Sequence, residues 1–156
     1  MNKVDIAYFA GIFDGEGCIY IRKINAKYVT KSGIQRIYTS YSVEVSLANT
    51  NEWICRQLLF AFGGGVYKRK LQMGANQTVW AWEIGAKKAT DFLRVLYPYL
   101  KLKRAQAEIA INFQNKMHRY GRTSSEELAL REAQRILVSN LNRPIRKKPK
   151  DEGTSK

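Results

Sequence analysis

The chain has 156 residues, 45% of them hydrophobic, which is enough for one domain with an apolar core. It carries 27 lysines and arginines against 13 aspartates and glutamates, a formal net charge of +14. Such an excess is typical of a protein with a polyanionic partner. Because the positive charge is spread along the whole chain and does not follow one amphipathic helix, nucleic acid is favoured over a membrane surface.

Cysteine and histidine are too sparse for the common zinc sites, since Cys18 and Cys55 lie far apart and His118 is the single histidine. We expect the cysteines to be small buried residues in a reducing compartment, and any metal to be a hard cation held by carboxylate and carbonyl oxygens. The longest apolar run, residues 6–13, is too short to span a membrane. The N-terminus also lacks the pattern of a signal peptide. We therefore expect an intracellular protein and leave its compartment open.

The first predicted helix covers residues 4–14 and leads into the most informative segment, residues 9–17, Phe-Ala-Gly-Ile-Phe-Asp-Gly-Glu-Gly. Acids at a helix C-terminus are disfavoured by a few tenths to about 1 kcal/mol, because that end carries partial negative charge. Asp14 and Glu16 therefore need a partner, for which a bound cation is the natural candidate. Small residues recur every four positions and share one face on which another backbone could approach closely: Ala7, Gly11 and Gly15.

Two long strands should follow, over residues 18–29 and 34–48, because apolar and polar residues alternate in both. The polar residues 30–33 should form the hairpin tip. A helix is expected over residues 51–62, with its N-cap in Asn49-Thr50-Asn51, and the glycines at 63–65 should end it.

A second hairpin is predicted from strands 66–71 and 77–84, joined by a turn at 74–76. Three helices should complete the domain, over residues 86–97, 101–117 and 124–140, the last opened by a capping signal at Ser124. The order predicts an α+β fold in which a helix-strand-strand unit occurs twice and gives a four-stranded antiparallel sheet, followed by C-terminal helices. The domain should span residues 1–141, and the basic, apolar-poor residues 142–156 should form a disordered tail.

One sheet face should pack on the helices and leave the other free. The free face carries mainly Tyr, Arg, hydroxyl groups and one Glu: Tyr20, Arg22, Ile24, Ser40, Ser42, Glu44, Ser46, Tyr67, Arg69 and Leu71. Lys68 and Lys70 should lie on the opposite face, and Trp80 and Trp82 in the core or at its edge. A two-stranded ribbon fits the major groove of DNA, and these side-chain types can read base edges there. For any single residue, a solvated sheet face is the alternative.

Residues 9–17 resemble the signature helix of the LAGLIDADG homing endonucleases, and the element order resembles members with a single motif. Further matches are Asn49-Thr50-Asn51, the stop at residues 62–65, and Tyr99-Leu100-Lys101-Leu102-Lys103 before a long helix, so the resemblance covers residues 4–118. The departures are Phe9 in place of the usual leucine and Glu16 in place of the commoner aspartate. The second change keeps the carboxylate.

The resemblance implies a homodimer in which two motif helices pack through the face of Ala7, Gly11 and Gly15. Glu16 of each copy would then lie near the two-fold axis, and its side chain and the Gly15 carbonyl would bind Mg²⁺. Mn²⁺ should substitute for Mg²⁺, and Ca²⁺ should bind without supporting cleavage. Asp14 is expected to support the helix end and not to bind metal.

The resemblance implies an intron-encoded enzyme that uses a divalent metal to hydrolyse double-stranded DNA at a long, near-palindromic site. Lys103 matches the family's basic residue near the phosphate. Asn49 is the chosen water-positioning residue, because an ungapped match places Leu47 there and leucine cannot do that work. An RNA maturase acting on intron RNA and a non-cleaving DNA-binding protein are alternatives on the same fold. A basic structural protein of the ribosomal type is the third interpretation.

Overall fold

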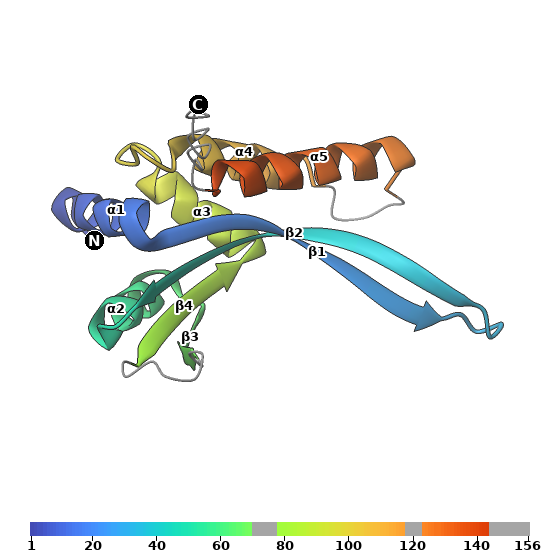
Figure 1. Ribbon diagram of the computed structural model, residues 1–156, viewed down its shortest axis with the longest axis horizontal. Helices are drawn as coiled ribbons and strands as arrows, with labels where there is room; N and C mark the ends of the chain where they lie inside the picture. Colours follow the sequence, from blue (N-terminus) through green and yellow to red (C-terminus); the bar gives the residue numbers. More distant parts are fainter. Residues whose placement is uncertain (70–77, 118–122, 144–156) are drawn as a thin grey trace, which may run out of the picture.

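The computed structural model describes residues 1–69, 78–117 and 123–143. The described helices and strands follow one another in the predicted order (Figure 1). They are α1 (Lys3–Glu16), β1 (Gly17–Val29), β2 (Gln35–Asn49), α2 (Glu52–Phe62), β3 (Gly65–Arg69), β4 (Val79–Gly85), α3 (Ala86–Leu96), α4 (Arg104–Asn115) and α5 (Ser125–Leu141). The predicted turn at 74–76, Lys70, Leu71 and His118 lie outside the described residues, as does the tail beyond residue 143. Within the described part, none of the helices has the length and apolar character needed to cross a membrane.

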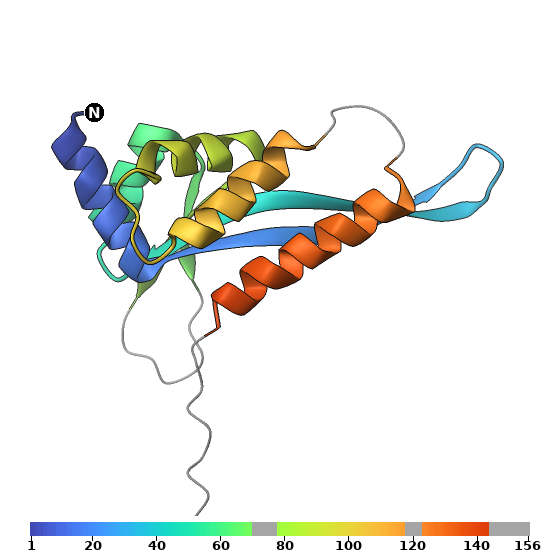
Figure 2. The same ribbon diagram turned by 90° about the horizontal axis from the view of Figure 1, so that it is seen from above.

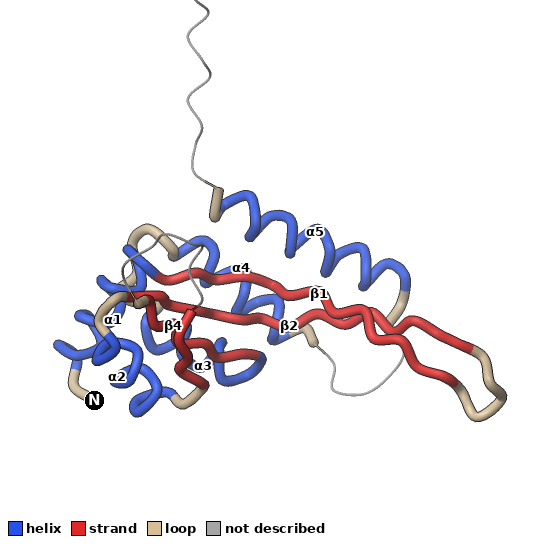
Figure 3. The backbone as a smooth tube through the Cα atoms, turned by 60° about the horizontal axis from the view of Figure 1, so that its bottom comes forward, coloured by secondary structure: helices blue, strands red, loops and turns tan. Residues whose placement is uncertain are grey.

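The predicted α+β fold with a four-stranded antiparallel sheet is confirmed. The strand order is β1-β2-β4-β3, so the two hairpins join through their second strands. The described helices gather on one side of this sheet (Figures 1 and 3). Opposite faces of the strands therefore meet different surroundings, as the alternation in the sequence predicts.

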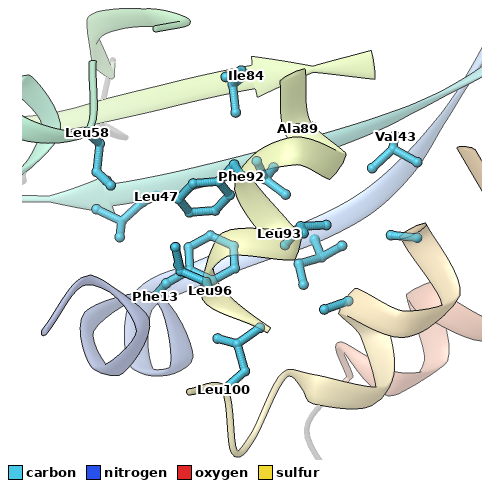
Figure 4. Packing of buried hydrophobic residues seen from close by; sticks show 14 of the residues in the cluster. Phe13, Val43, Leu47, Leu58, Ile84, Ala89, Phe92, Leu93, Leu96 and Leu100 are labelled. Atoms are coloured by element: carbon cyan, nitrogen blue, oxygen red, sulfur yellow. The ribbon is translucent and has the colours of Figure 1, made fainter. Parts of the chain in front are cut away.

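The core lies between the helices and the inner face of the sheet (Figure 4). Phe92 of α3 stands at its centre, with its ring centroid 5.0 Å from Phe13, 4.8 Å from Phe62 and 5.0 Å from Trp82. Such edge-to-face aromatic pairs add to the free energy gained by burying apolar area. The prediction that Trp82 packs inward is confirmed, and Trp80 packs at the edge of the same core.

The ends of the helices follow their local sequence. Asn51 caps α2 by accepting a hydrogen bond from the Trp53 N–H at 3.0 Å, and Ser124 forms a capping box with Glu127 at the start of α5.

After α2 the chain turns through Gly63 and Gly64, whose φ angles are 76° and 94°. A Cβ on Gly64 would meet the Glu83 carbonyl oxygen at 2.3 Å. Glycine is therefore needed there for both its conformation and its size.

The hairpin of β1 and β2 extends well beyond the helices as a two-stranded arm (Figure 1). Ile21 and Tyr41 are the last fully buried side chains along its length, 4% exposed in each case. From the pair Lys23–Tyr41 outward the arm projects, while α5 runs along its base (Figure 2). The arm is thus a long extension anchored only at one end of the molecule.

The two cysteines are free thiols. Cys55 is buried, as expected, whereas Cys18 is only partly buried. Burial raises the pKa of both thiols above the ordinary value, so both favour the neutral form.

Candidate active site

The C-terminal end of α1 is held by a buried carboxylate. Asp14 is 7% exposed and accepts main-chain hydrogen bonds from Lys101 at 2.6 Å, Leu102 at 3.2 Å and Lys103 at 2.9 Å. Hydrogen bonds from backbone N–H groups to an ionised carboxylate are among the stronger ones in proteins. They offset the cost of placing an acid at this end of a helix. Asp14 therefore supports the helix end, as expected.

The same contacts correct one predicted boundary. A helix was expected to begin at residue 101, but α4 begins at Arg104. The N–H groups of residues 101–103 point at Asp14 instead, so this segment wraps around the carboxylate before the helix starts. The prediction was wrong because a partner 87 residues away along the chain competes for this backbone.

Lys103 lies directly beside the end of α1. Its Nζ donates a hydrogen bond to the Asp14 carbonyl oxygen. That carbonyl belongs to the last turn of α1, where carbonyl groups lack partners within the helix and favour a cation. The ammonium group is thus fixed close to Gly15 and Glu16 by the fold itself.

Glu16 is exposed and has one partner from the sheet. Asn49, the last residue of β2, donates from Nδ2 to Glu16 Oε2. The Asn49 side-chain oxygen accepts the Asn51 N–H at 2.7 Å, so the amide is oriented by the turn into α2. Leu47 is 1% exposed in the core, which leaves Asn49 as the polar group at this strand end that contacts Glu16.

The oxygens at this end of α1 suit a hard divalent cation in kind but are few in number. The Glu16 carboxylate and the carbonyls of the last turn, including that of Gly15, are the donor types that Mg²⁺ prefers. Residues 1–69, 78–117 and 123–143 contain no group of three or more His, Cys, Asp or Glu that could hold a metal ion. A cation here would therefore take its remaining ligands from water, from a phosphate or from a second chain.

The face of α1 that carries the small residues is not packed against any other described part of the chain. Ala7, Gly11 and Gly15 are exposed, and a Cβ built on either glycine meets no described atom within 4 Å. Val4 and Tyr8, also on α1, are 77% and 51% exposed. Beside them lies an open apolar groove of about 680 Å³ between α1 and α2. An exposed helix surface of small and apolar residues is typical of a protein interface.

The predicted free face of the sheet exists. The register pairs Tyr20 with Glu44, Arg22 with Ser42 and Ile24 with Ser40 across β1 and β2. Ser46 continues this face toward β4, and Tyr67 and Arg69 lie on it in β3. No described helix covers this side (Figure 3). Lys68 is on the opposite face, as predicted, where its ammonium lies 5.2 Å from the Trp80 ring centroid.

Two carboxylates at the sheet, one on each of its faces, were not predicted from the sequence. Glu83 of β4 lies on the free face, opposite Ser46. The signal was present, because with Trp82 inward its neighbour must point outward. The other group is at the base of the arm, where Glu132 of α5 accepts from Tyr41 Oη at 2.8 Å and pairs with Lys23 at 3.3 Å. No pattern along the chain points to that contact.

No protein-family model and no curated protein matches the sequence. The homing endonuclease I-CvuI, solved in complex with the I-CreI target in the presence of Mg, superposes with a TM-score of 0.69 at 21% identity over 93% of this chain and 87% of that chain. A second structure of I-CvuI, in complex with its own target in the presence of Ca, gives a TM-score of 0.68 at 21% identity, covering 92% of this chain and 86% of that chain.

Two further solved structures are similar. The archaeal intron-encoded homing endonuclease I-Vdi141I, complexed with DNA, gives a TM-score of 0.64 at 13% identity, covering 90% of this chain and 85% of that chain. The homing endonuclease I-TnaI gives 0.60 at 18% identity, covering 87% and 92%. Sequence identities this low establish the architecture alone. The chain has the fold of these homing endonucleases.

Proposed function

We propose that this protein is a divalent-metal-dependent, sequence-specific double-strand DNA endonuclease that acts as a homodimer. The observation that carries the proposal is the position of Glu16. Its exposed carboxylate lies at the end of an unpacked helix face, within reach of Asn49 and next to the end of α1 where Lys103 is anchored. The fold shared with DNA-bound homing endonucleases supports the same function.

The exposed face of α1 supports the dimer. Two copies packed through Ala7, Gly11 and Gly15 would bring the C-terminal ends of both helices together, because these residues run to the last turn of α1. Each copy would then add one Glu16 carboxylate. Two such acids repel each other at close range unless cations lie between them. The dimer would therefore supply the cation with carboxylate ligands from two chains, where one chain offers too few.

Glu16 and the Gly15 carbonyl would hold the divalent cation. When bound, the cation would polarise the scissile phosphate and promote ionisation of a water molecule. Asn49 orients the Glu16 carboxylate through Nδ2. Lys103 places a positive charge where a phosphate would gain negative charge as its bond breaks, and its tether to Asp14 keeps that charge in position.

The sheet supports duplex DNA as the substrate. The arm of β1 and β2 has the form of a ribbon that fits the major groove, and the free face presents Arg, Tyr and hydroxyl groups. Two arms related by a two-fold axis would read two half-sites of opposite orientation. The target should therefore be a long, near-palindromic sequence.

The test begins with selection of binding sites from random duplex DNA, followed by cleavage of the enriched sequence in Mg²⁺, Mn²⁺ or Ca²⁺. We expect the parent protein to cut both strands in Mg²⁺ and Mn²⁺ and to bind without cutting in Ca²⁺. Glu16→Gln should bind the same sequence and cut at least about a hundredfold more slowly. Glu126→Gln, at an exposed acid in the first turn of α5, is the matched control and should cut normally.

Equal cleavage rates for Glu16→Gln and the parent would overturn the mechanism. A gel shift in which structured intron RNA binds more tightly than duplex DNA would instead support a maturase on the same fold. A chain that enriches no long motif at all would point to a basic structural protein.

A further inference from the structure

The free face of the sheet carries the same residue types on its two sides, although their register across the strands differs. A Tyr-x-Arg segment lies on each outer strand, Tyr20 and Arg22 on β1 and Tyr67 and Arg69 on β3. A glutamate lies on each of the two middle strands, Glu44 on β2 and Glu83 on β4. Two acids thus stand at the centre of a surface whose proposed partner is a polyanion.

The β1 side of this arrangement is joined by hydrogen bonds. Tyr20 Oη donates to Glu44 Oε2 at 3.0 Å, and Arg22 Nη1 donates to Glu44 Oε1 at 3.1 Å. Each carboxylate oxygen therefore has one partner within the protein and one lone pair left for an external donor. The Arg22 side chain is 60% exposed and that of Glu44 is 16% exposed. The arginine can thus reach a ligand while the acid stays in place.

The β3 side is electrostatically linked to the β1 side. Burial and the adjacent Glu83 carboxylate raise the pKa of Tyr67 to about 12, and Glu44 adds to this effect. Burial and the hydrogen-bonded Glu44 likewise raise the pKa of Tyr20, with a further contribution from Glu83. Both phenols are therefore neutral hydrogen-bond donors at physiological pH, and each stands beside a carboxylate that can accept.

A carboxylate on a DNA-binding surface weakens the attraction to phosphates, so it must act through the base edges if it acts in binding. In the major groove, guanine offers the O6 and N7 acceptors to arginine, and cytosine offers its N4 amino group to a carboxylate. One G·C pair presents both sets of groups together. An arginine and a glutamate held side by side match that pattern. A thymine or a guanine would present an acceptor to the glutamate, and two acceptors cannot form a hydrogen bond.

We propose that Arg22 and Glu44 together read one G·C base pair in each half-site, with Arg22 on the guanine and Glu44 on the cytosine amino group. This assignment rests on the proposed function. Glu44 has two roles: it accepts from cytosine and it holds Arg22 in the orientation that reaches guanine. Tyr20 fixes the carboxylate from the other side. Glu83 lies on another strand of the same face, opposite Ser46, and would act at a separate position of the half-site.

The test is selection of duplex binding sites in Ca²⁺ with the parent protein, Glu44→Gln, Glu83→Gln and the remote control Glu126→Gln. We expect the parent to require G·C at a defined position of each half-site. Glu44→Gln should lose that preference at this position alone, since an amide donates as well as accepts and suits adenine better than cytosine. Glu83→Gln should change a different position, and Glu126→Gln none.

A second measurement tests the contact between Arg22 and guanine directly. Replacing the guanine at that position by 7-deazaguanine removes N7, and we expect it to weaken binding by the parent by about tenfold or more. The same replacement should have little effect on Arg22→Ala. A thermal unfolding midpoint equal to that of the parent would show, for each variant, that the surface substitution leaves the fold intact.

A Glu44→Gln profile identical to that of the parent at every position would overturn this assignment while the proposed function stands. Loss of preference at many positions together would also overturn it, because the residue would then act on the sheet as a whole. If the parent enriches no duplex motif, the proposed function fails first and the assignment fails with it.

Discussion

Asp14 and Lys103 hold each other through both main chain and side chain. The Asp14 carboxylate accepts the Lys103 N–H at 2.9 Å, and Lys103 Nζ donates to the Asp14 carbonyl oxygen. This reciprocal contact joins the last turn of α1 to the loop before α4. It fixes the position of the Lys103 ammonium relative to Glu16, because the loop that carries Lys103 cannot move independently of the last turn of α1.

Replacing Asp14 by Asn should therefore damage stability and activity together. The amide keeps the volume but loses the charge that strengthens three N–H contacts, and its NH₂ group opposes some of them. We expect the free energy of unfolding, measured by urea denaturation, to fall by roughly 2 kcal/mol. Cleavage should fall more steeply than the folded fraction, because the loop that carries Lys103 is held less firmly against α1.

Asp91→Asn is the matched control. Asp91 is a surface acid paired with Lys87 and Arg94, each at 2.7 Å, and exposed pairs contribute about 1 kcal/mol or less. A loss of stability in Asp14→Asn no larger than that of Asp91→Asn would contradict the role assigned to Asp14.

Gly11→Leu should separate folding from association. No atom of residues 1–69, 78–117 or 123–143 lies within 4 Å of a Cβ built at Gly11, and leucine is a better helix former than glycine by close to 1 kcal/mol. The isolated chain should therefore be no less stable. In a dimer packed through this face, the added side chains would overpack the interface by about 1–3 kcal/mol. Sedimentation velocity should show the dissociation constant of the dimer raised by at least about tenfold.

Gly11→Ala should give a smaller effect in the same direction. Lys88→Leu adds an apolar side chain to an exposed position of α3 and should leave association unchanged. A Gly11→Leu protein that dimerises as tightly as the parent would show that the copies meet through another surface.

Glu132 should make the stability depend on acid pH. Hydrogen bonds first from Arg135 and then from Tyr41 lower the pKa of this carboxyl from 4.5 to about 2. Because the folded pKa lies below the unfolded one, the stabilisation is complete above about pH 4.5 and is lost as the pH falls toward 2. The parent should be more stable than Glu132→Gln at pH 6, and the difference should shrink across that window.

Unfolding curves of both proteins between pH 6 and about pH 2.5 measure this directly. Glu126→Gln supplies the control, since it removes an acid from the same helix and should show no comparable change of the difference with pH. A difference in the free energy of unfolding between parent and Glu132→Gln that stays constant across this pH range would mean that Glu132 is not paired in solution. The arm would then lack this brace at its base.

The sequence predicts the elements well where the evidence is local. Alternation over β1 and β2 gave the correct faces, because a strand shows successive side chains to opposite sides. The caps at Asn51 and Ser124 marked the starts of α2 and α5 correctly, since a cap bonds within its own turn. The start of α4 was predicted wrongly because its competitor, Asp14, is distant in sequence.

The candidate site divides in the same way. Glu16 stood out from the sequence because an acid at the end of a small-residue helix calls for a partner. Its contact with Asn49 and the anchoring of Lys103 near it depend on how α1, β2 and the loop before α4 meet. Residue types favoured Asn49 over Leu47 because leucine is apolar, and the structure places Leu47 in the core, 1% exposed.

By itself, the sequence determined the element order, the faces of the strands, the small-residue face of α1 and the excess of positive charge. The first three follow from the spacing of residue types over short segments, and the last follows from composition. Only the tertiary structure decided which distant groups meet: Asp14 with the backbone of 101–103, Glu44 with Tyr20 and Arg22, and Glu132 with the base of the arm. Such pairs form when packing of the core brings remote segments together. Their energies depend on distance and burial, which no local pattern records.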